Sequence, residues 1–244
     1  MDQRELVEYG AFLRQRREYL LDRISKAAIR SGRDSHEILL LAVSKTVDVP
    51  HMLEAYRQGY TAFGENRPQD LYRKAEALQH IPDLRIDMIG NLQTNKINKV
   101  LGRVALVHSV ATLHLAEALS TRARTRDLQV RCLLEVNVSG EESKAGAAPK
   151  DAARIIERMS TLGNLSVEGL MTMAPAHDDS EARRTFNGLR ELRDDLRASV
   201  GLELPVLSCG MSGDFEIAIE EGSTLVRLGR IVFDASYDVD GHKQ

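Results

Sequence analysis

The feature that most constrains the fold is an alternation of short apolar runs with amphipathic segments along the 244-residue chain. Apolar runs that are bounded by polar residues are typical of strands buried on both faces of a parallel sheet. The predicted strands are Leu39–Val43, Tyr60–Phe63, Ile86–Ile89, Val104–Val107, Val130–Val136, Leu165–Leu170, Leu204–Ser208 and Thr224–Leu228. The predicted helices between them span about 48–59, 68–78, 94–101, 112–125, 149–160, 180–197 and 214–221.

Strands and helices that alternate eight times over one domain length predict a single (β/α)8 barrel of the TIM type, spanning 1–244. An open, doubly wound sheet is the alternative, but such sheets usually have about five or six strands, and no G-x-G-x-x-G opens a helix here. Residues 2–31 predict one long amphipathic helix that covers the barrel, because apolar side chains recur at helical spacing. The tail 238–244 is expected to fray.

Charge and composition disfavour several partners. Net charge is −3, with 33 basic and 36 acidic residues mixed along the chain, so we expect no polybasic face for nucleic acid or membrane. The chain has no Trp and only 5% aromatic residues, which leaves few rings for stacking on bases. The chain start lacks the apolar core of a signal peptide, and Cys132 and Cys209 form no CxxC pair. We therefore expect a cytoplasmic protein.

The end of the first strand carries a candidate nucleophile, Lys45. It lies at the carboxyl end of a strand, where α/β barrels place their chemistry. A lysine that is partly withdrawn from water is a nucleophilic amine that can form a Schiff base with an aldehyde. From this stretch alone, a solvated lysine just past a strand is the alternative.

Two glycine-containing loops predict a phosphate site. In barrels of this kind, phosphate often binds the loops after strands seven and eight through backbone N–H groups. The loop Ser208–Asp214 offers glycines and the hydroxyls of Ser208 and Ser212, and Gly229-Arg230 is the matching loop after the eighth strand. An ordinary glycine turn would explain either loop alone. Together with a Schiff-base lysine, the loops match pyridoxal phosphate (PLP), which needs an amine for its aldehyde and an anion site for its phosphate.

Arg227 lies within the eighth predicted strand. A charge there is costly if it points into the barrel without a partner, so an outward arginine paired with a helix carboxylate is one interpretation. If it points inward, its guanidinium can donate to the pyridine nitrogen of PLP. A fixed cation at that nitrogen disfavours its protonation and makes the ring a weaker electron sink, which is poor equipment for stabilising carbanions.

Several stretches carry a resemblance to a known family. They are AVSKT (42–46), FGEN (63–66), IGNLQTNK (89–96), VNVSGEESKAG (136–146), EGLMTM (168–173), LSCGMSGDFEIAI (207–219) and GSTLVRLG (222–229). They resemble the pyridoxal phosphate homeostasis proteins, single-barrel relatives of the N-terminal domain of alanine racemase. The resemblance runs in order from about residue 5 to 236.

The resemblance also implies roles for individual residues. It implies Lys45 as the Schiff-base lysine, Asn66 beside the cofactor, Met171 against the ring, Arg227 at the pyridine nitrogen, Ser212, Gly229 and Arg230 at the phosphate, and Lys144 as a second lysine near the mouth. The chain departs from the family where Arg230 replaces a usual threonine, Arg67 a tyrosine, and Asp87 the histidine of the common WHFIG motif. These departures leave PLP affinity and release open.

The resemblance implies a protein that binds and buffers PLP and delivers it, with PLP-dependent apoenzymes as potential partners, without strong catalysis of its own. We expect a monomer. The alternative is a small PLP-dependent racemase or lyase. A racemase needs a second acid–base group opposite the lysine, which alanine racemases take from a further domain, and the chain ends soon after strand eight. A Schiff-base aldolase would not need Arg227, and a metal enzyme is disfavoured because the histidines show no H-x-x-x-H spacing.

Overall fold

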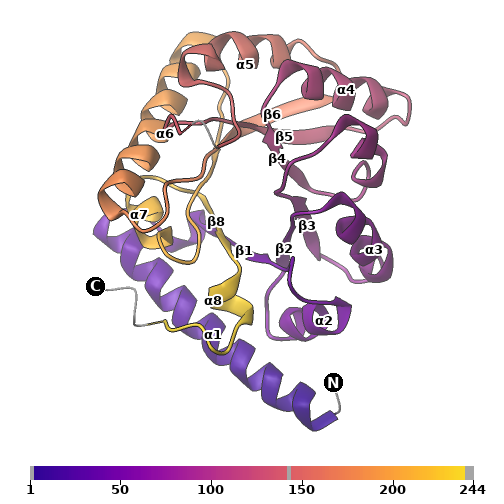
Figure 1. The fold of residues 1–244 in the computed structure, drawn as a ribbon, viewed down its shortest axis with the longest axis vertical. Coiled ribbons are helices and arrows are strands. Elements are labelled where there is room, and N and C mark those ends of the chain that lie inside the picture. The colour runs from indigo at the N-terminus through magenta and orange to yellow at the C-terminus, as the bar shows by residue number, and fades with distance from the viewer. Residues whose placement is uncertain (1–2, 142–143, 240–244) are drawn as a thin grey trace.

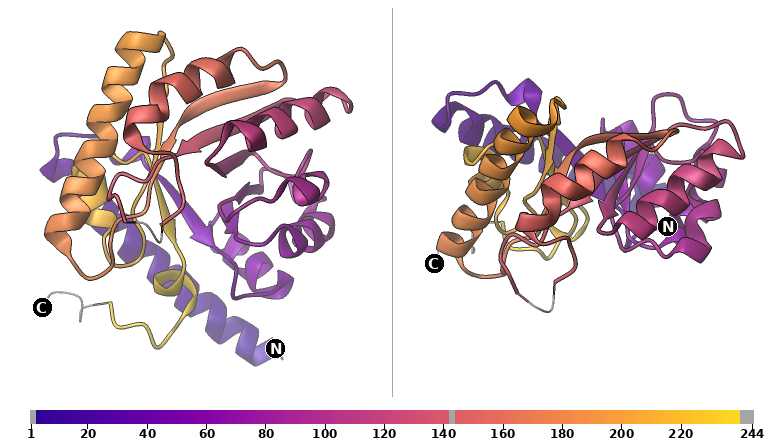
Figure 2. Two further views of the ribbon diagram at one scale, coloured as in Figure 1. Left: turned by 45° about the horizontal axis from the view of Figure 1, so that its top comes forward. Right: turned by 90° about the horizontal axis from the view of Figure 1, so that it is seen from above.

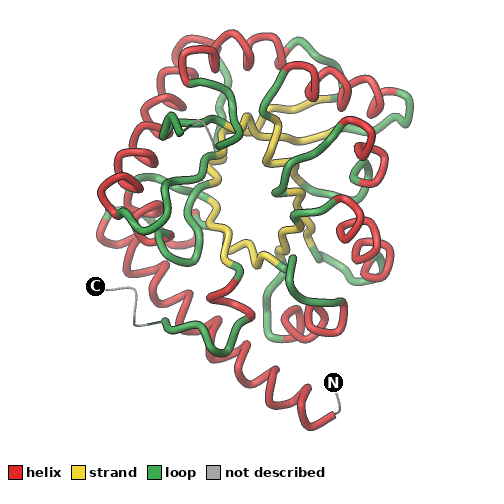
Figure 3. Tube along the Cα trace, in the orientation of Figure 1, coloured by secondary structure: helices red, strands yellow, loops and turns green. Residues whose placement is uncertain are grey.

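The computed structural model describes residues 3–141 and 144–239, and its centre is a closed barrel of eight parallel strands in the order β1 to β8 (Figures 1 and 3). The strands are β1 Leu39–Val43, β2 Ala62–Glu65, β3 Arg85–Met88, β4 Leu106–Val110, β5 Val130–Glu135, β6 Leu165–Met171, β7 Val206–Ser208 and β8 Leu225–Leu228. Pairing of β1 with β8, which places Leu39 opposite Leu225, closes the ring. The predicted (β/α)8 barrel is confirmed.

Helices surround the strands on the outside of the ring (Figure 2). The α-helices are α1 Gln3–Arg30, α2 Val49–Arg57, α3 Pro68–Leu78, α4 Leu113–Arg124, α5 Ala152–Ser160, α6 Asp179–Val200, α7 Phe215–Glu220 and α8 Arg230–Phe233, and the 3-10 helices are η1 Ser35–Glu37, η2 Thr94–Lys99 and η3 Pro149–Asp151. The predicted helix 94–101 is thus a 3-10 helix, and the first turn of 149–160 is also 3-10. None of the helices in the described part of the chain is long and apolar enough to cross a membrane.

The predicted N-terminal helix is present as α1 and packs on the outside of the barrel. Its buried face, which includes Leu20 and Ile24, shares one core with Phe215 of α7 and Ile231 of α8. Because α8 has only four residues, α1 covers the flank that a longer last helix would cover (Figure 1). The helix ends at Arg30 and is followed by a turn at Gly32, whose φ of +69° suits glycine; the N–H groups of Gly32 and Arg33 donate to the carbonyls of Ile29 and Ala28.

Four strands begin later than predicted: β2, β4, β7, which begins at Val206 rather than Leu204, and β8, which begins at Leu225 rather than Thr224. β2 begins at Ala62 rather than Tyr60, because the Tyr60 N–H closes the end of α2 on Ala55. β4 begins at Leu106 and runs to Val110, so His108 lies inside a strand rather than in the loop after it. A strand predicted from a run of apolar residues ends too early when the strand contains a buried polar side chain that is hydrogen-bonded elsewhere in the barrel.

The tail is held to α1 as far as Val239. The Val239 carbonyl accepts hydrogen bonds from the Tyr19 hydroxyl at 3.1 Å and from Arg23 Nη1 at 3.3 Å. Of the tail 238–244 that was predicted to fray, residues 240–244 lie outside the described part. The last described residues therefore remain tied to the N-terminal helix.

The interior of the barrel is apolar in part and polar in part. Its apolar cluster contains Leu41, Ala62, Leu106, Leu133, Met171 and Leu225. Polar side chains from β3, β4, β7 and β8 meet across the barrel, and these carry the candidate site.

Candidate functional site

Arg227 of β8 points into the barrel. Its side chain is 5% exposed, and Nη1 donates to the carbonyl of Ser208 at 2.8 Å and to its hydroxyl at 2.7 Å. Nη2 donates to the Thr172 carbonyl at 3.0 Å. Among the described residues Arg227 forms no ion pair, so the outward arginine paired with a helix carboxylate is not what the structure shows. Burial lowers the pKa of Arg227, which still leaves it a cation near neutrality.

A chain of buried polar side chains continues from Ser208. The Ser208 hydroxyl lies 2.9 Å from Nδ1 of His108, and Nε2 of His108 lies 3.0 Å from Oδ2 of Asp87. Arg85 donates to both carboxylate oxygens of Asp87, at 2.9 and 2.8 Å. Desolvation lowers the pKa of His108, so its imidazole is neutral at pH 7. The predicted site residues Ser208 and Arg227 are thus joined to Asp87 and His108, for which the sequence predicted no role in the site.

The two predicted phosphate loops meet. The backbone N–H of Ile231, directly after Arg230, donates to the Ser212 hydroxyl at 3.4 Å, and the Tyr237 hydroxyl donates to the Ser212 carbonyl at 3.3 Å. Gly210 shapes the first loop, because its φ is +93° and a Cβ there would lie 2.7 Å from Cβ of Ala218. The Ser212 hydroxyl and the backbone N–H that follows Arg230 therefore meet where the sequence predicts phosphate.

The strand-eight loop also touches the end of β1. A Cβ on Gly229 would lie 3.4 Å from Cβ of Val43, so the loop runs alongside the strand that leads to Lys45. Arg230 is exposed, with its guanidinium 5.7 Å from the ring centroid of Tyr237. The phosphate loops and the lysine loop are therefore neighbours at the mouth of the barrel.

Lys45 and Asn66 are both exposed at the mouth. The preceding residue, Ser44, is buried, and its carbonyl accepts a hydrogen bond from Lys74 Nζ at 2.8 Å. Ser44 thus fills the space between β1 and α3, and Lys45, the next residue, lies in the open mouth. The sequence predicted a lysine partly withdrawn from water, and the structure differs on that point. Gly90 approaches the Asn66 backbone closely, because a Cβ on Gly90 would lie 2.1 Å from the Asn66 carbonyl oxygen.

Met171 and Lys144 lie on the β5–β6 side of the mouth. Met171 is buried at the end of β6, directly opposite Ser208 of β7. Lys144 Nζ lies 3.2 Å from Oε1 of Glu141 and 3.5 Å from the Met173 carbonyl. It is therefore near the end of β6, where the Thr172 carbonyl accepts a hydrogen bond from Arg227. The structure brings Met171 to the Ser208–Arg227 pair and leaves Lys144 paired with an acid at the rim.

Comparison with known proteins identifies the family. The family model for the alanine racemase N-terminal domain matches residues 26–236. The pyridoxal phosphate homeostasis protein of Aquifex aeolicus is 43% identical over 220 residues, which cover 90% of this chain and 96% of that protein. The chain belongs to the pyridoxal phosphate homeostasis protein family.

Solved structures agree with this family assignment. A crystal structure of an unknown protein from Bifidobacterium adolescentis has a TM-score of 0.89 at 39% identity and covers 96% of this chain and 97% of that chain. PipY of Synechococcus elongatus, solved with PLP bound, has a TM-score of 0.77 at 31% identity and covers 87% of this chain and 99% of that chain.

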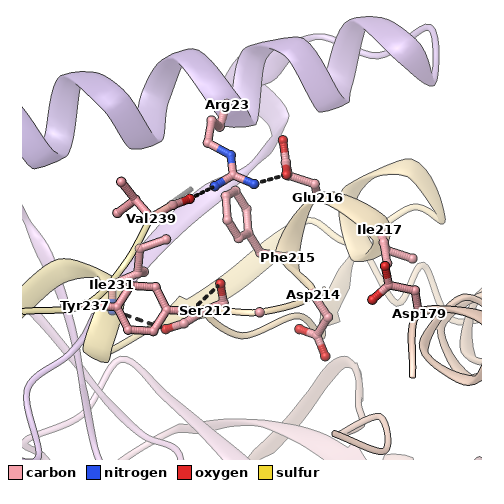
Figure 4. Close-up of a pocket in the computed structure, with 11 residues that line it drawn as sticks. Arg23, Asp179, Ser212, Asp214, Phe215, Glu216, Ile217, Ile231, Tyr237 and Val239 are labelled. Atoms are coloured by element: carbon pink, nitrogen blue, oxygen red, sulfur yellow. Dashed lines mark hydrogen bonds and ion pairs between the residues drawn. The ribbon is translucent and has the colours of Figure 1, made fainter. Parts of the chain in front are cut away.

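In this family member, one cavity of about 310 Å³ flanks the phosphate loops on the outer side of the barrel (Figure 4). Arg23 of α1 and Glu216 of α7, which form an ion pair, line it together with Ser212. Of the predicted site residues, Ser212 is the one that lines this cavity in the described part of the chain. The cavity is therefore distinct from the mouth that contains Lys45. Across the described residues, no group of three His, Cys, Asp or Glu side chains is placed to hold a metal ion.

Sequence reasoning also missed a buried acid near Arg227. Glu135 ends β5 and is 5% exposed. Burial raises the pKa of Glu135, and the nearby charge of Arg227 opposes that rise. A charged residue at the end of an apolar strand is a signal for such a position, but it does not say which partner lies across the barrel.

Proposed function

We propose that this protein binds PLP through a Schiff base on Lys45, and that it buffers the cofactor in the cytoplasm and delivers it to PLP-dependent apoenzymes, as a monomer without strong catalysis of its own. The observation that carries the proposal is the inward orientation of Arg227, which places a fixed donor inside the barrel beneath the predicted phosphate loops. The PLP bound to PipY, a relative at 31% identity, supports the choice of ligand.

The residues present fit PLP by their chemistry. The pyridine nitrogen is an acceptor, and Arg227 has only donors. A phosphate needs N–H groups, hydroxyls and positive charge, which the Ser212 hydroxyl and the segment from Gly229 to Ile231 provide. When bound, PLP supplies an aldehyde carbon that condenses reversibly with an amine and a ring that withdraws electrons. In our proposal Lys45 supplies that amine, Asn66 lies beside the cofactor, and Met171 packs against the ring.

The absence of strong catalysis follows from two groups. Arg227 is held by two carbonyls and a hydroxyl, so a cation faces the ring nitrogen and disfavours its protonation. The tyrosines nearest the strand ends are engaged elsewhere, because the Tyr60 hydroxyl donates to the Leu13 carbonyl and that of Tyr237 to the Ser212 carbonyl. Neither is aimed at the mouth as a second acid–base group, which disfavours a racemase.

The test is the visible spectrum of the purified protein with PLP, before and after borohydride reduction, in the wild type, Lys45→Ala and Lys144→Ala. We expect a visible band and a borohydride-stable adduct in the wild type and Lys144→Ala, and neither in Lys45→Ala, whose fold should survive because the side chain is exposed. An adduct that persists undiminished in Lys45→Ala would place the bond on another lysine.

A second arm tests the enzymatic alternative with the same PLP-loaded protein. Common amino acids are incubated with it in D2O, and exchange of the α-proton is followed by NMR. We expect no exchange above that of free PLP. Steady turnover that disappears in Lys45→Ala would establish a PLP enzyme instead of a carrier.

A further inference from the structure

The buried chain that links Arg227 to Asp87 spans four strands of the barrel. Ser208 is on β7, His108 on β4 and Asp87 on β3, and the side chains of all three are inaccessible to solvent. Successive polar atoms lie 2.7, 2.9 and 3.0 Å apart. Four polar side chains joined by successive hydrogen bonds in the barrel core are costly to bury, so their arrangement calls for a reason.

The donor inventory fixes the direction of every hydrogen bond in the chain. Arginine has no acceptor, so Arg227 donates to the Ser208 hydroxyl oxygen. An ionised carboxylate has no donor, so Nε2 of His108 carries the proton that faces Asp87. In a neutral imidazole the other nitrogen is then an acceptor, and Nδ1 receives the Ser208 hydroxyl proton. Each hydroxyl or ring N–H in this series of hydrogen bonds therefore donates toward Asp87.

Because every hydrogen bond in this series points the same way, the series connects the Asp87 carboxylate to the Arg227 guanidinium, which has no ion-pair partner among the described residues. The negative charge of Asp87 makes the His108 ring a stronger acceptor, which makes the Ser208 oxygen a stronger acceptor in turn. Arg85, whose side chain is 28% exposed, holds Asp87 from its other side with two hydrogen bonds. The two carbonyls of Ser208 and Thr172 locate the guanidinium, and the Ser208 hydroxyl is the contact through which His108 and Asp87 act on it.

We propose that Asp87 and His108 are positioning residues for Arg227, which act through Ser208 to hold its guanidinium in the orientation that meets the pyridine nitrogen of the cofactor. This inference rests on the proposed function and adds to it a tuning device on the far side of the barrel.

The experiment compares Asp87→Asn and His108→Gln with the wild type. Asparagine keeps the shape of Asp87 but loses its charge, and it can donate to Nε2 of His108 and thereby move the ring proton to Nδ1. Glutamine reaches Asp87 but no longer accepts from Ser208. Glu54→Gln is the matched control, because Glu54 is a buried acid of α2, 7% exposed, which pairs with Arg57 and Gln58 away from the barrel interior.

Two readouts are used. NMR of 15N-labelled histidine reports the tautomer of His108, which we expect as Nε2–H in the wild type and Glu54→Gln and as Nδ1–H in Asp87→Asn. Titration with PLP, followed by its visible band, reports the cofactor. We expect a displaced band maximum and binding weaker by about tenfold in Asp87→Asn and His108→Gln, the usual effect of losing one hydrogen bond to a charged group. Glu54→Gln should match the wild type.

The outcomes separate this inference from the proposed function. A wild type that shows no visible band with PLP overturns the proposed function and this inference with it. A normal wild-type band that is unchanged in position and affinity in both variants overturns the inference alone. A loss of affinity with an unmoved band maximum also overturns it, because a purely structural role would produce that result. If Asp87→Asn fails to fold, His108→Gln gives the same decision.

Discussion

The buried ion pair beneath the lysine loop allows a quantitative prediction. Lys74 of α3 and Glu65 of β2 are essentially inaccessible, with Nζ 2.7 Å from Oε1, and Nζ also donates to the Ser44 carbonyl at 2.8 Å. The other oxygen, Oε2, is buried without a hydrogen-bond partner among the described residues. Lys74→Met therefore leaves a buried carboxylate without a counter-charge, and removing one partner of such a pair costs about 3–5 kcal/mol.

The double variant separates the value of the pair from the cost of breaking it. Lys74→Met combined with Glu65→Gln removes both charges, and replacement of a whole buried pair is often close to neutral. We expect the double variant to recover most of the loss, to within about 1–2 kcal/mol of the wild type, because an amide at position 65 still accepts from the Ser44 hydroxyl. The double variant should therefore lose less free energy of unfolding than the sum of the losses in the two single variants.

The assay is urea unfolding followed by circular dichroism, with free energies extrapolated linearly to water. A loss below about 1 kcal/mol in Lys74→Met would refute the reasoning, because that is the value of a solvated pair. A double variant as unstable as Lys74→Met would also refute it, since the Glu65 charge would then not be the source of the cost. Either result would mean that water reaches this site.

Two further predictions concern the phosphate loops and the thiols. Arg230→Thr should weaken PLP binding about threefold at low salt and should reduce its salt dependence, because an exposed cation acts on phosphate through a screened charge; tighter binding in visible-band titrations at two salt concentrations would exclude Arg230 as a phosphate ligand. Burial raises the pKa of Cys132 from 9.0 to about 12 and that of Cys209 to about 11, so unfolding releases protons from both thiols above pH 9. The free energy of unfolding should then fall as pH rises from about 9 to 11, less steeply in Cys132→Ala, and a thiol reagent that reacts fully with the folded protein at pH 8 would contradict the burial.

The barrel could be predicted from the sequence because parallel strands buried on both faces leave continuous apolar runs. The run Leu39–Val43 coincides with β1, and the number of such runs gives the number of strands. The method was wrong where a strand contains a buried polar residue. β4 includes His108, whose partners are 21 and 100 residues away in sequence, and no local pattern announces such pairings.

The sequence predicted the loops of the candidate site but not the direction of its central arginine. The loops with Ser212 and Gly229-Arg230 could be found because glycine turns at strand ends are local signals, and the structure places these loops together. The direction of Arg227 could not be found, since all four residues of β8 are buried and alternation does not show which face points inward. The structure decides it, because Arg227 lies two residues after Leu225, which belongs to the interior cluster.

The division between buried and exposed groups bears on the proposed delivery of cofactor. The groups that would orient the ring, Arg227 and Ser208, are buried and held in place by several hydrogen bonds within the barrel. Lys45 is exposed at the mouth. If PLP is held as a Schiff base on Lys45, the exposure of this lysine would let a second amine reach the bond, and exchange between the two amines would pass the aldehyde on without free PLP. A closed site would favour retention of the cofactor and catalysis. Buried groups that orient the ring below an exposed lysine favour reversible binding and release of the cofactor instead.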